Sequence, residues 1–274
     1  MKKLLLLTAI IFLFSAARPT QQTWVAIGDS ITYLNDHLNE TGNRVTKGYM
    51  TRVTEKLPHL TFVNQGHNGW TSGQIAESVD KLGLVKANVY SVFLGTNDWW
   101  RGRPLGRLSD YQANTGNATV YGSFRIIINK LRSLNPQAKI VLITPMQRAD
   151  FVYLTNFKNN AYGSYKAKNG QYLEAFANAI DSIGRVEQVP VVDLYHVRQL
   201  GVAKLVKFKR LKNPQTGVYT NYPYPAFIDV PFSPDTDEYP YPTEAIEMTY
   251  DGLHPSDAGY AQISKRLVKV LKKL

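Results

Sequence analysis

Cysteine is absent from this 274-residue chain, so its fold contains no disulfide, and there is no N-terminal cysteine to which a lipid could be attached. A chain of this length can bury roughly three quarters of its unfolded surface, so we expect its apolar core to hold it together. Histidine is scarce, at five residues, and the histidines and carboxylates never fall into ligand spacing such as H-x-x-x-H. A glycine-rich phosphate loop is missing as well. The sequence therefore predicts neither a metal site nor a cofactor.

Long apolar runs are also missing, apart from one short stretch near the N-terminus. Two lysines precede an apolar run over residues 4–14, and three small residues follow, ending at Ala17. This layout is typical of a secretory signal peptide, here residues 1–17, whereas a membrane span needs about 20 apolar residues. We therefore expect a secreted or periplasmic protein without stable membrane insertion after cleavage. An uncleaved N-terminal anchor is the alternative.

The net charge of +11 is concentrated in two basic segments, at 204–212 and at 264–274. Such segments can attract an acidic polymer or a membrane surface. They can equally be solvated helix faces, with a cationic C-terminal turn that complements the helix dipole. Export argues against a nucleic-acid partner, and no nucleic-acid-binding motif is present.

After the predicted signal peptide, short apolar runs alternate with segments of helical spacing. This alternation predicts an α/β fold, a parallel sheet covered by helices on both faces, in a single domain over residues 18–274. For two helix ends we expect Ser72 to be an N-cap and Gly184 a C-cap. Strands are expected at 23–28, 60–66, 89–95, 138–145 and 189–195, and helices at 49–57, 72–82, 120–134, 172–184 and 256–274.

One segment, residues 206–250, departs from the alternation because it is rich in proline and tyrosine. Its prolines rule out a long helix or a central strand. We expect an ordered insertion that packs across the domain. Its tyrosines either line a substrate cleft or belong to a proline-stiffened surface loop.

Ser30 follows the first expected strand in "WVAIGDSIT" and is either a helix N-cap or a nucleophile. A serine nucleophile needs a base within hydrogen-bond reach. In "YDGLHPSDAGY", Asp251 lies three residues before His254 and could fix its tautomer and stabilise the imidazolium. The other four histidines have no such partner at fixed spacing and are read as surface or packing residues. His67 is the least secure of these, because it lies in a strand-end loop.

Acyl transfer also needs donors aimed at the developing oxyanion. Gly69 follows the second expected strand and could offer a backbone N–H, while Asn97 follows the third and could offer its side-chain amide. Together with the Ser30 N–H they would make three donors from three consecutive strand ends. Asn97 could also be a turn-forming residue, which is common after strands.

The ordered blocks "GDS", "NQGHNG", "GTND" and "DGLHP" resemble the SGNH (GDSL-like) hydrolase family of esterases and lipases. The resemblance implies a flavodoxin-like three-layer α/β/α sandwich with five parallel strands. It implies Ser30, His254 and Asp251 as a catalytic triad, with the oxyanion hole formed by Ser30, Gly69 and Asn97. The leucine of the family motif is replaced by isoleucine here, a mild change. Gly69 is preferred to Gly66 because of its place in the second block, and Asp29 and Asp98 are read as loop supports.

Aromatic and cationic residues next to these blocks bear on the substrate. Trp70, Trp99, Trp100 and Arg101 are the expected substrate contacts, and two adjacent tryptophans at a strand end should not both be buried. Aromatic faces suit sugar rings and also acyl chains, although these rings could instead plug the loops against the core. We predict an enzyme that removes O-acetyl groups from a carbohydrate. The alternatives are a lipid esterase, lysophospholipase or thioesterase, and a non-catalytic carbohydrate-binding module.

Overall fold

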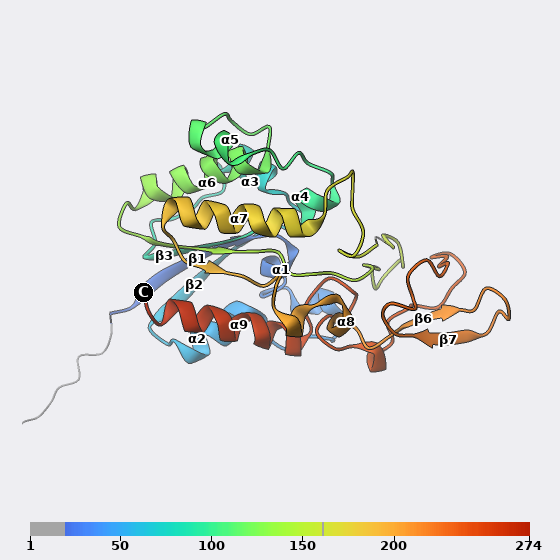
Figure 1. The fold of residues 1–274 in the computed structure, drawn as a ribbon. Coiled ribbons are helices and arrows are strands. Elements are labelled where there is room, and N and C mark those ends of the chain that lie inside the picture. Colours follow the sequence, from blue (N-terminus) through green and yellow to red (C-terminus); the bar gives the residue numbers. More distant parts are fainter. Residues whose placement is uncertain (1–19, 161) are drawn as a thin grey trace, which may run out of the picture.

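The computed structural model describes residues 20–160 and 162–274, so the expected signal peptide at 1–17 lies outside the described residues (Figure 1). Its central sheet has five parallel strands in the order β2-β1-β3-β4-β5. This is the flavodoxin-like order, in which the crevice at the carboxyl ends of β1 and β3 marks the topological switch point. The predicted fold class is therefore confirmed. The strands are β1 (Gln22–Gly28), β2 (Leu60–Gly66), β3 (Val89–Phe93), β4 (Lys139–Ile143) and β5 (Val191–Val192).

Helices cover both faces of the sheet. Successive strand residues point to opposite sides, and in β1 apolar residues point to both, so both faces are buried. Trp24 and Ala26 of β1 belong to the core beneath one face, and Val25 and Ile27 belong to the core beneath the other. In Figure 1 the first face carries α2 and α9, and the second carries α3, α5, α6 and α7. These helices are α2 (Tyr49–Lys56), α3 (Ser72–Ser78), α5 (Leu108–Ala113), α6 (Val120–Leu134), α7 (Leu173–Glu187) and α9 (Asp257–Leu271).

The longest helices, α6, α7 and α9, contain 15 residues each. Among residues 20–160 and 162–274, no helix combines the length and apolar character needed to cross a bilayer. Shorter helical segments lie at strand ends and in connections. They are α1 (Ser30–Tyr33), α4 (Thr96–Trp100), α8 (Val202–Leu205), η1 (Leu38–Thr41), η2 (Arg198–Leu200) and η3 (Thr243–Ala245).

Two predicted helix caps are wrong. The N-cap of α3 is Thr71, which forms a capping box with Gln74, and Ser72 is already the first helical residue. Helix α7 continues past Gly184 to a left-handed C-cap at Gln188. A Cβ on Gly184 would lie 2.2 Å from a Val191 methyl, so this glycine allows close packing of α7 on β5.

Residues 206–250, all of which the structure describes, contain neither a long helix nor a strand of the central sheet. Within them, β6 (Lys209–Lys212) and β7 (Tyr219–Tyr222) form a separate antiparallel hairpin. Figure 1 shows this hairpin, in orange, beyond the carboxyl-terminal end of the sheet. The segment thus adds a small lobe at the end of the sheet where the strand-end loops gather.

Candidate active site

Ser30, His254 and Asp251 form a continuous hydrogen-bonded chain. Ser30 Oγ lies 2.8 Å from His254 Nε2, and His254 Nδ1 lies 2.7 Å from Asp251 Oδ2. All three residues are buried, with exposed fractions of 6%, 7% and 3%. Residues 224 positions apart in the sequence are therefore in direct contact at the end of β1. The geometry is that of a nucleophile, a base and a group that orients the base.

Ser30 is placed by the end of β1 and the start of α1. Asp29 is the N-cap of α1, and its carboxylate accepts a hydrogen bond from the Ile31 N–H at 3.0 Å. Burial raises the pKa of Asp29 to about 6, although the Ile31 hydrogen bond and the nearby His254 act in the opposite direction. Because Asp29 already caps the helix, the Ser30 hydroxyl is free to bond His254.

A tight turn fixes the imidazole of His254. Asp251 Oδ1 accepts hydrogen bonds from the backbone N–H groups of Leu253, at 3.0 Å, and of His254, at 2.7 Å. The ring is stacked on Tyr250 with centroids 5.9 Å apart and meets Phe151 edge-on at 5.1 Å. One carboxylate therefore holds both the backbone and the ring of the histidine, and two aromatic rings limit its rotation.

Glycine is required at position 252 of this turn. Gly252 has φ +89°, which side-chain-bearing residues rarely adopt. A Cβ there would also lie 2.0 Å from the Asp150 carbonyl oxygen. The turn thus presses against the segment that follows β4.

Three candidate oxyanion donors lie around one cleft. The Ser30 N–H belongs to the first residue of α1, where backbone N–H groups have no partner within the helix. Gly69 adopts φ +74° in the loop after β2, and Asn97 lies in the first turn of α4. The Asn97 amide donates one hydrogen bond to the Trp70 carbonyl at 3.0 Å, and the amide carries a second N–H. Ser30, Gly69 and Asn97 all line the same cleft, which has a volume of about 380 Å³.

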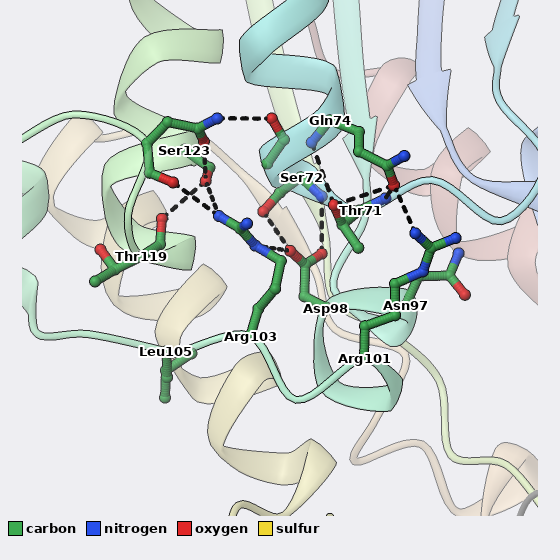
Figure 2. Close-up of polar contacts among 12 residues, drawn as sticks. Thr71, Ser72, Gln74, Asn97, Asp98, Arg101, Arg103, Leu105, Thr119 and Ser123 are labelled. Atoms are coloured by element: carbon green, nitrogen blue, oxygen red, sulfur yellow. Dashed lines mark hydrogen bonds and ion pairs between the residues drawn. The ribbon is translucent and has the colours of Figure 1, made fainter. Parts of the chain in front are cut away.

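A buried carboxylate ties the Asn97 turn to the Gly69 loop (Figure 2). Asp98 is fully buried and accepts hydrogen bonds from the Ser72 N–H at 2.9 Å and the Ser72 hydroxyl at 2.7 Å. Arg103 Nε lies 3.2 Å from the same carboxylate. Burial raises the pKa of Asp98, and the Ser72 hydrogen bonds and Arg103 oppose the shift. Asp98 therefore acts as the loop support that the sequence motif suggests.

Arg101 also reaches the Gly69 loop. Its guanidinium donates to the Gly69 carbonyl at 2.7 Å. It also donates to the Gln74 side-chain oxygen at 3.2 Å (Figure 2). The side chain lines the cleft as well, as the sequence predicts for a substrate contact. Arg101 therefore stabilises the Gly69 loop and also lines the cleft.

The tryptophans divide between the core and the cleft. Trp99 is 0% exposed and its indole N–H donates to the Gln171 carbonyl at 2.9 Å, so the expectation that it contacts substrate is wrong. Trp100 lines the cleft. Trp70 stacks on His67, with centroids 4.5 Å apart, and is not among the residues that line the cleft. The expectation of a substrate contact is thus kept for Trp100 alone among the three.

One wall of the cleft is not predictable from the sequence motifs. Residues after β4 that no motif marks complete the lining beside Ser30 and His254. Their only sequence signal is that they follow the carboxyl end of a parallel strand, where active groups gather. They are Arg148, Phe151, Tyr153 and Asn159.

The tyrosines of residues 206–250 support this wall from behind. The Tyr241 hydroxyl donates to the Asp150 carbonyl at 2.5 Å, and the Tyr239 hydroxyl donates to the Val152 carbonyl at 3.1 Å. Within residues 206–250, Tyr250 alone borders the site, in an adjoining hollow of about 300 Å³. Tyr239 and Tyr241 thus hold the loop that lines the cleft, and none of the tyrosines of residues 206–250 lines that cleft itself.

One expectation about the histidines is wrong. His196 also has an aspartate three residues earlier, and its Nδ1 lies 2.8 Å from Asp193 Oδ2. Its Nε2, however, lies 3.3 Å from Glu174, and the imidazole is 46% exposed. This pair therefore has no serine to activate. In the part of the chain that the structure describes, no cluster of three or more histidines and carboxylates is arranged to hold a metal ion.

Comparison with known proteins agrees with this geometry. Residues 26–262 match the model of the GDSL-like lipase/acylhydrolase family. The crystal structure of a possible lipase from Chitinophaga pinensis DSM 2588 is 67% identical, with a TM-score of 0.91, over 92% of this chain and 98% of that one. No curated protein matches the chain.

Two more distant structures share the fold. A lipase/acylhydrolase from Enterococcus faecalis is 17% identical, with a TM-score of 0.51, over 92% of this chain and 96% of that one. The acetyl xylan esterase AlAXEase is 16% identical, with a TM-score of 0.53, over 90% of this chain and 98% of that one. With the family model spanning most of its length, this chain belongs to the GDSL-like lipase/acylhydrolase family and is a carboxylic ester hydrolase.

Proposed function

We propose that this protein is a secreted serine esterase that removes O-acetyl groups from a carbohydrate through Ser30, His254 and Asp251. The observation that carries the proposal is the hydrogen-bonded chain of these three residues beside a cleft lined by Gly69 and Asn97. The Ser30–His254 contact has the length needed for proton transfer between a nucleophile and its base, and the His254–Asp251 bond orients that base.

The first half of the reaction forms an acyl-enzyme. In the tautomer that donates its Nδ1–H to Asp251, the His254 Nε2 accepts the Ser30 proton as Oγ attacks the ester carbonyl carbon. The electrons of the carbonyl π bond move to the oxygen. The resulting oxyanion accepts hydrogen bonds from the Ser30 N–H, the Gly69 N–H and the free N–H of Asn97. When the carbonyl re-forms, the C–O bond to the alcohol breaks, and His254 returns the proton to the departing alcohol.

The second half releases the acid. A water molecule gives a proton to His254 as its oxygen attacks the acyl carbon bound to Ser30. The second tetrahedral intermediate uses the same donors. When it collapses, the bond to Oγ breaks, the acid leaves, and Ser30 takes back the proton from His254.

The lining of the cleft favours a small acyl group on a polar alcohol. The cleft around Ser30 is lined both by side chains that can bond hydroxyl groups and by the aromatic side chains of Trp100, Phe151 and Tyr153. Aromatic faces and polar groups together suit a sugar ring better than an alkyl chain. The acetyl xylan esterase named above shares the fold, which is compatible with this substrate class. The polar lining residues are Ser30, Asn68, Asn97, Arg101, Arg148, Asn159 and His254.

A lipid esterase, lysophospholipase or thioesterase is the second candidate. The 67% identical structure is described as a possible lipase, which favours it. A non-catalytic carbohydrate-binding module would need neither the Ser30–His254 contact nor the oxyanion donors. Hydrolysis rates separate these three functions.

The test is the initial hydrolysis rate on p-nitrophenyl esters from acetyl to octanoyl, for the wild type, Ser30→Ala and the control Ser133→Ala. Ser133 is exposed on α6, away from the cleft. We expect a rate that falls beyond acetyl, is abolished in Ser30→Ala and is unchanged in Ser133→Ala. A rate that rises with chain length would point to lipids, and no rate that depends on Ser30 would point to the binding module.

Export is proposed from the N-terminal sequence alone. Expression of the full chain followed by N-terminal sequencing of the exported protein tests it. We expect cleavage after Ala17. Retention of the intact N-terminus would favour the anchor.

A further inference from the structure

Arg148 places a buried guanidinium at the cleft. It follows β4, is 1% exposed and lines the cleft together with Ser30 and His254. Its guanidinium carbon lies 5.5 Å from the ring centroid of Trp99 and 5.3 Å from that of Trp100. The Phe151 ring is 5.8 Å away. Aromatic rings thus orient a cation that hardly touches solvent.

The hydrogen-bond donors of this guanidinium are not satisfied by the protein. Nε and Nη2 are buried and have no hydrogen-bond partner within residues 20–160 and 162–274. The backbone of Arg148, by contrast, is fixed, since its N–H donates to the Ser164 hydroxyl at 3.1 Å and its carbonyl accepts from the Ser164 N–H at 2.9 Å. Leaving buried charged donors without acceptors is costly. Arg148 therefore combines a fixed backbone with a buried, incompletely paired guanidinium in a residue that lines the cleft.

The neighbouring carboxylates are already engaged. Asp150 binds Lys209 Nζ at 2.9 Å and the Gly163 N–H at 3.0 Å, and Asp251 binds His254. Burial lowers the pKa of Arg148 to about 10, and the two carboxylates oppose the shift, so the guanidinium keeps its charge at neutral pH. The cleft lining holds a second arginine, Arg101, and no aspartate or glutamate. The two charged side chains among the lining residues, Arg101 and Arg148, are therefore both cationic.

We propose that Arg148 forms a carboxylate-binding subsite in the cleft, so that the preferred substrate is an ester of an acidic sugar such as an acetylated uronic acid. A planar guanidinium pairs with a carboxylate through charge-assisted N–H···O bonds, and Arg148 is the buried cation that lines the cleft. This inference rests on the proposed function only for the sugar and the acetyl group. The anion subsite itself follows from Arg148 and its surroundings.

The first experiment uses the wild type and needs no substitution. Glucuronate, glucose and glycerol phosphate are compared as competitive inhibitors of p-nitrophenyl acetate hydrolysis. We expect an inhibition constant for glucuronate about 10- to 100-fold below that for glucose, the usual worth of a charge-assisted pair. Equal constants for the two sugars would overturn the proposal. Strongest inhibition by glycerol phosphate would also overturn it and point to a phospholipid headgroup.

The second experiment removes the charge. In Arg148→Gln the ratio of the glucose and glucuronate inhibition constants is expected to fall to about one, whatever the basal rate, and Arg148→Lys should keep part of it. The control Arg185→Gln removes an arginine whose side chain is 74% exposed on α7 and should leave the ratio unchanged. An unchanged ratio in Arg148→Gln would mean that the arginine only packs against the tryptophans, and the proposal would fail.

Failure of the subsite and failure of the proposed function are distinguishable. If no ester is hydrolysed in a Ser30-dependent way, the proposed function fails, and calorimetric titration of glucuronate and glucose into the wild type still measures the subsite. If Arg148→Gln does not fold, as judged by near-ultraviolet circular dichroism, the wild-type comparison and Arg148→Lys decide the question.

Discussion

Lys209 holds the loop that forms the cleft wall after β4, so its replacement tests whether residues 206–250 support the active site. Its ammonium group binds Asp150 Oδ2 at 2.9 Å and the Asn160 side-chain oxygen at 2.8 Å. The lysine side chain is 1% exposed and that of Asp150 is 10% exposed. Burial lowers the pKa of Lys209, and Asp150 opposes the shift. This buried ion pair joins β6 to the segment that carries Arg148 and Phe151.

Lys209→Met removes one partner of the pair and leaves the carboxylate of Asp150 buried without its counter-charge. Losing one partner of a buried pair costs about 3–5 kcal/mol of the free energy of unfolding. Because the Gly163 N–H still donates to Asp150, we expect the loss in the free energy of unfolding to lie toward the lower end of that range. Because Asp150 lies between two residues of the cleft wall, we also expect kcat/KM to fall by up to about 10²-fold, as small displacements of positioned groups do.

Urea unfolding followed by circular dichroism measures the first effect, and p-nitrophenyl acetate hydrolysis measures the second. Lys212→Met is the matched control, because Lys212 lies on the same strand with its side chain 41% exposed and pairs with Asp237 at 3.0 Å. It should lose less than about 1 kcal/mol. Lys209→Met combined with Asp150→Asn should recover much of the loss. A Lys209→Met variant as stable as the control would refute the reasoning.

Three further predictions concern the strand-end loops. Asn97→Ala should lower kcat by about 10²- to 10³-fold, the usual worth of one oxyanion donor, and an unchanged kcat would remove Asn97 from the hole. Asp98→Asn weakens the bonds to Ser72 and should lower kcat and the free energy of unfolding together; activity assays and urea unfolding check this, and loss of neither would contradict the loop-support role. In the folded protein the pKa of Asp29 is raised to about 6, from 3.8. Between these two pH values the folded protein binds a proton that the unfolded chain has released. The contribution of Asp29 to the free energy of unfolding therefore falls as the pH rises from about 4 to about 6. Asp29→Asn, which keeps a cap acceptor, should therefore gain roughly 2–4 kcal/mol over the wild type between pH 4 and pH 7, and a constant difference across that range would count against the shift.

The sequence predicted the sheet and its helices because each element has a regular period of apolar residues. It also predicted which residues meet at the carboxyl edge of the sheet, because "GDS", "GTND" and the loop around Gly69 each follow a strand. The Ser30–His254 contact joins residues 224 positions apart. The spacing of Asp251 and His254 marked the histidine as a candidate base, and the family resemblance implied the same pairing.

Three errors have physical causes. Trp99 was expected to contact substrate, whereas α4 turns it into the core and leaves only its neighbour Trp100 at the cleft; the two tryptophans are not both buried, as expected. Gly184 looked like a cap because glycine favours left-handed ends, but here its missing side chain allows α7 to approach β5. Thr71 and Ser72 are both good N-caps, and their order in the helix is set by the contact of Ser72 with Asp98.

The cleft wall after β4 could not be predicted, because the apolar residues of this segment have no regular spacing. The segment takes its course from tertiary contacts with residues about 60 to 90 positions later, through Lys209 at a separation of 59 and Tyr241 at 91. Neither partner is marked by a motif. For the same reason the sequence left open whether the tyrosines of residues 206–250 line the cleft or belong to a surface loop, and Tyr239 and Tyr241 lie behind the cleft wall.

The central claim is that Ser30 is the nucleophile, and covalent labelling tests it most directly. A fluorophosphonate is added to the wild type, Ser30→Ala, His254→Ala and Ser133→Ala, and the modified peptide is identified by mass spectrometry. We expect one adduct, on Ser30, that is present in Ser133→Ala, absent in Ser30→Ala and formed much more slowly in His254→Ala. An adduct on another residue, or an active wild type that is never labelled at Ser30, would contradict it.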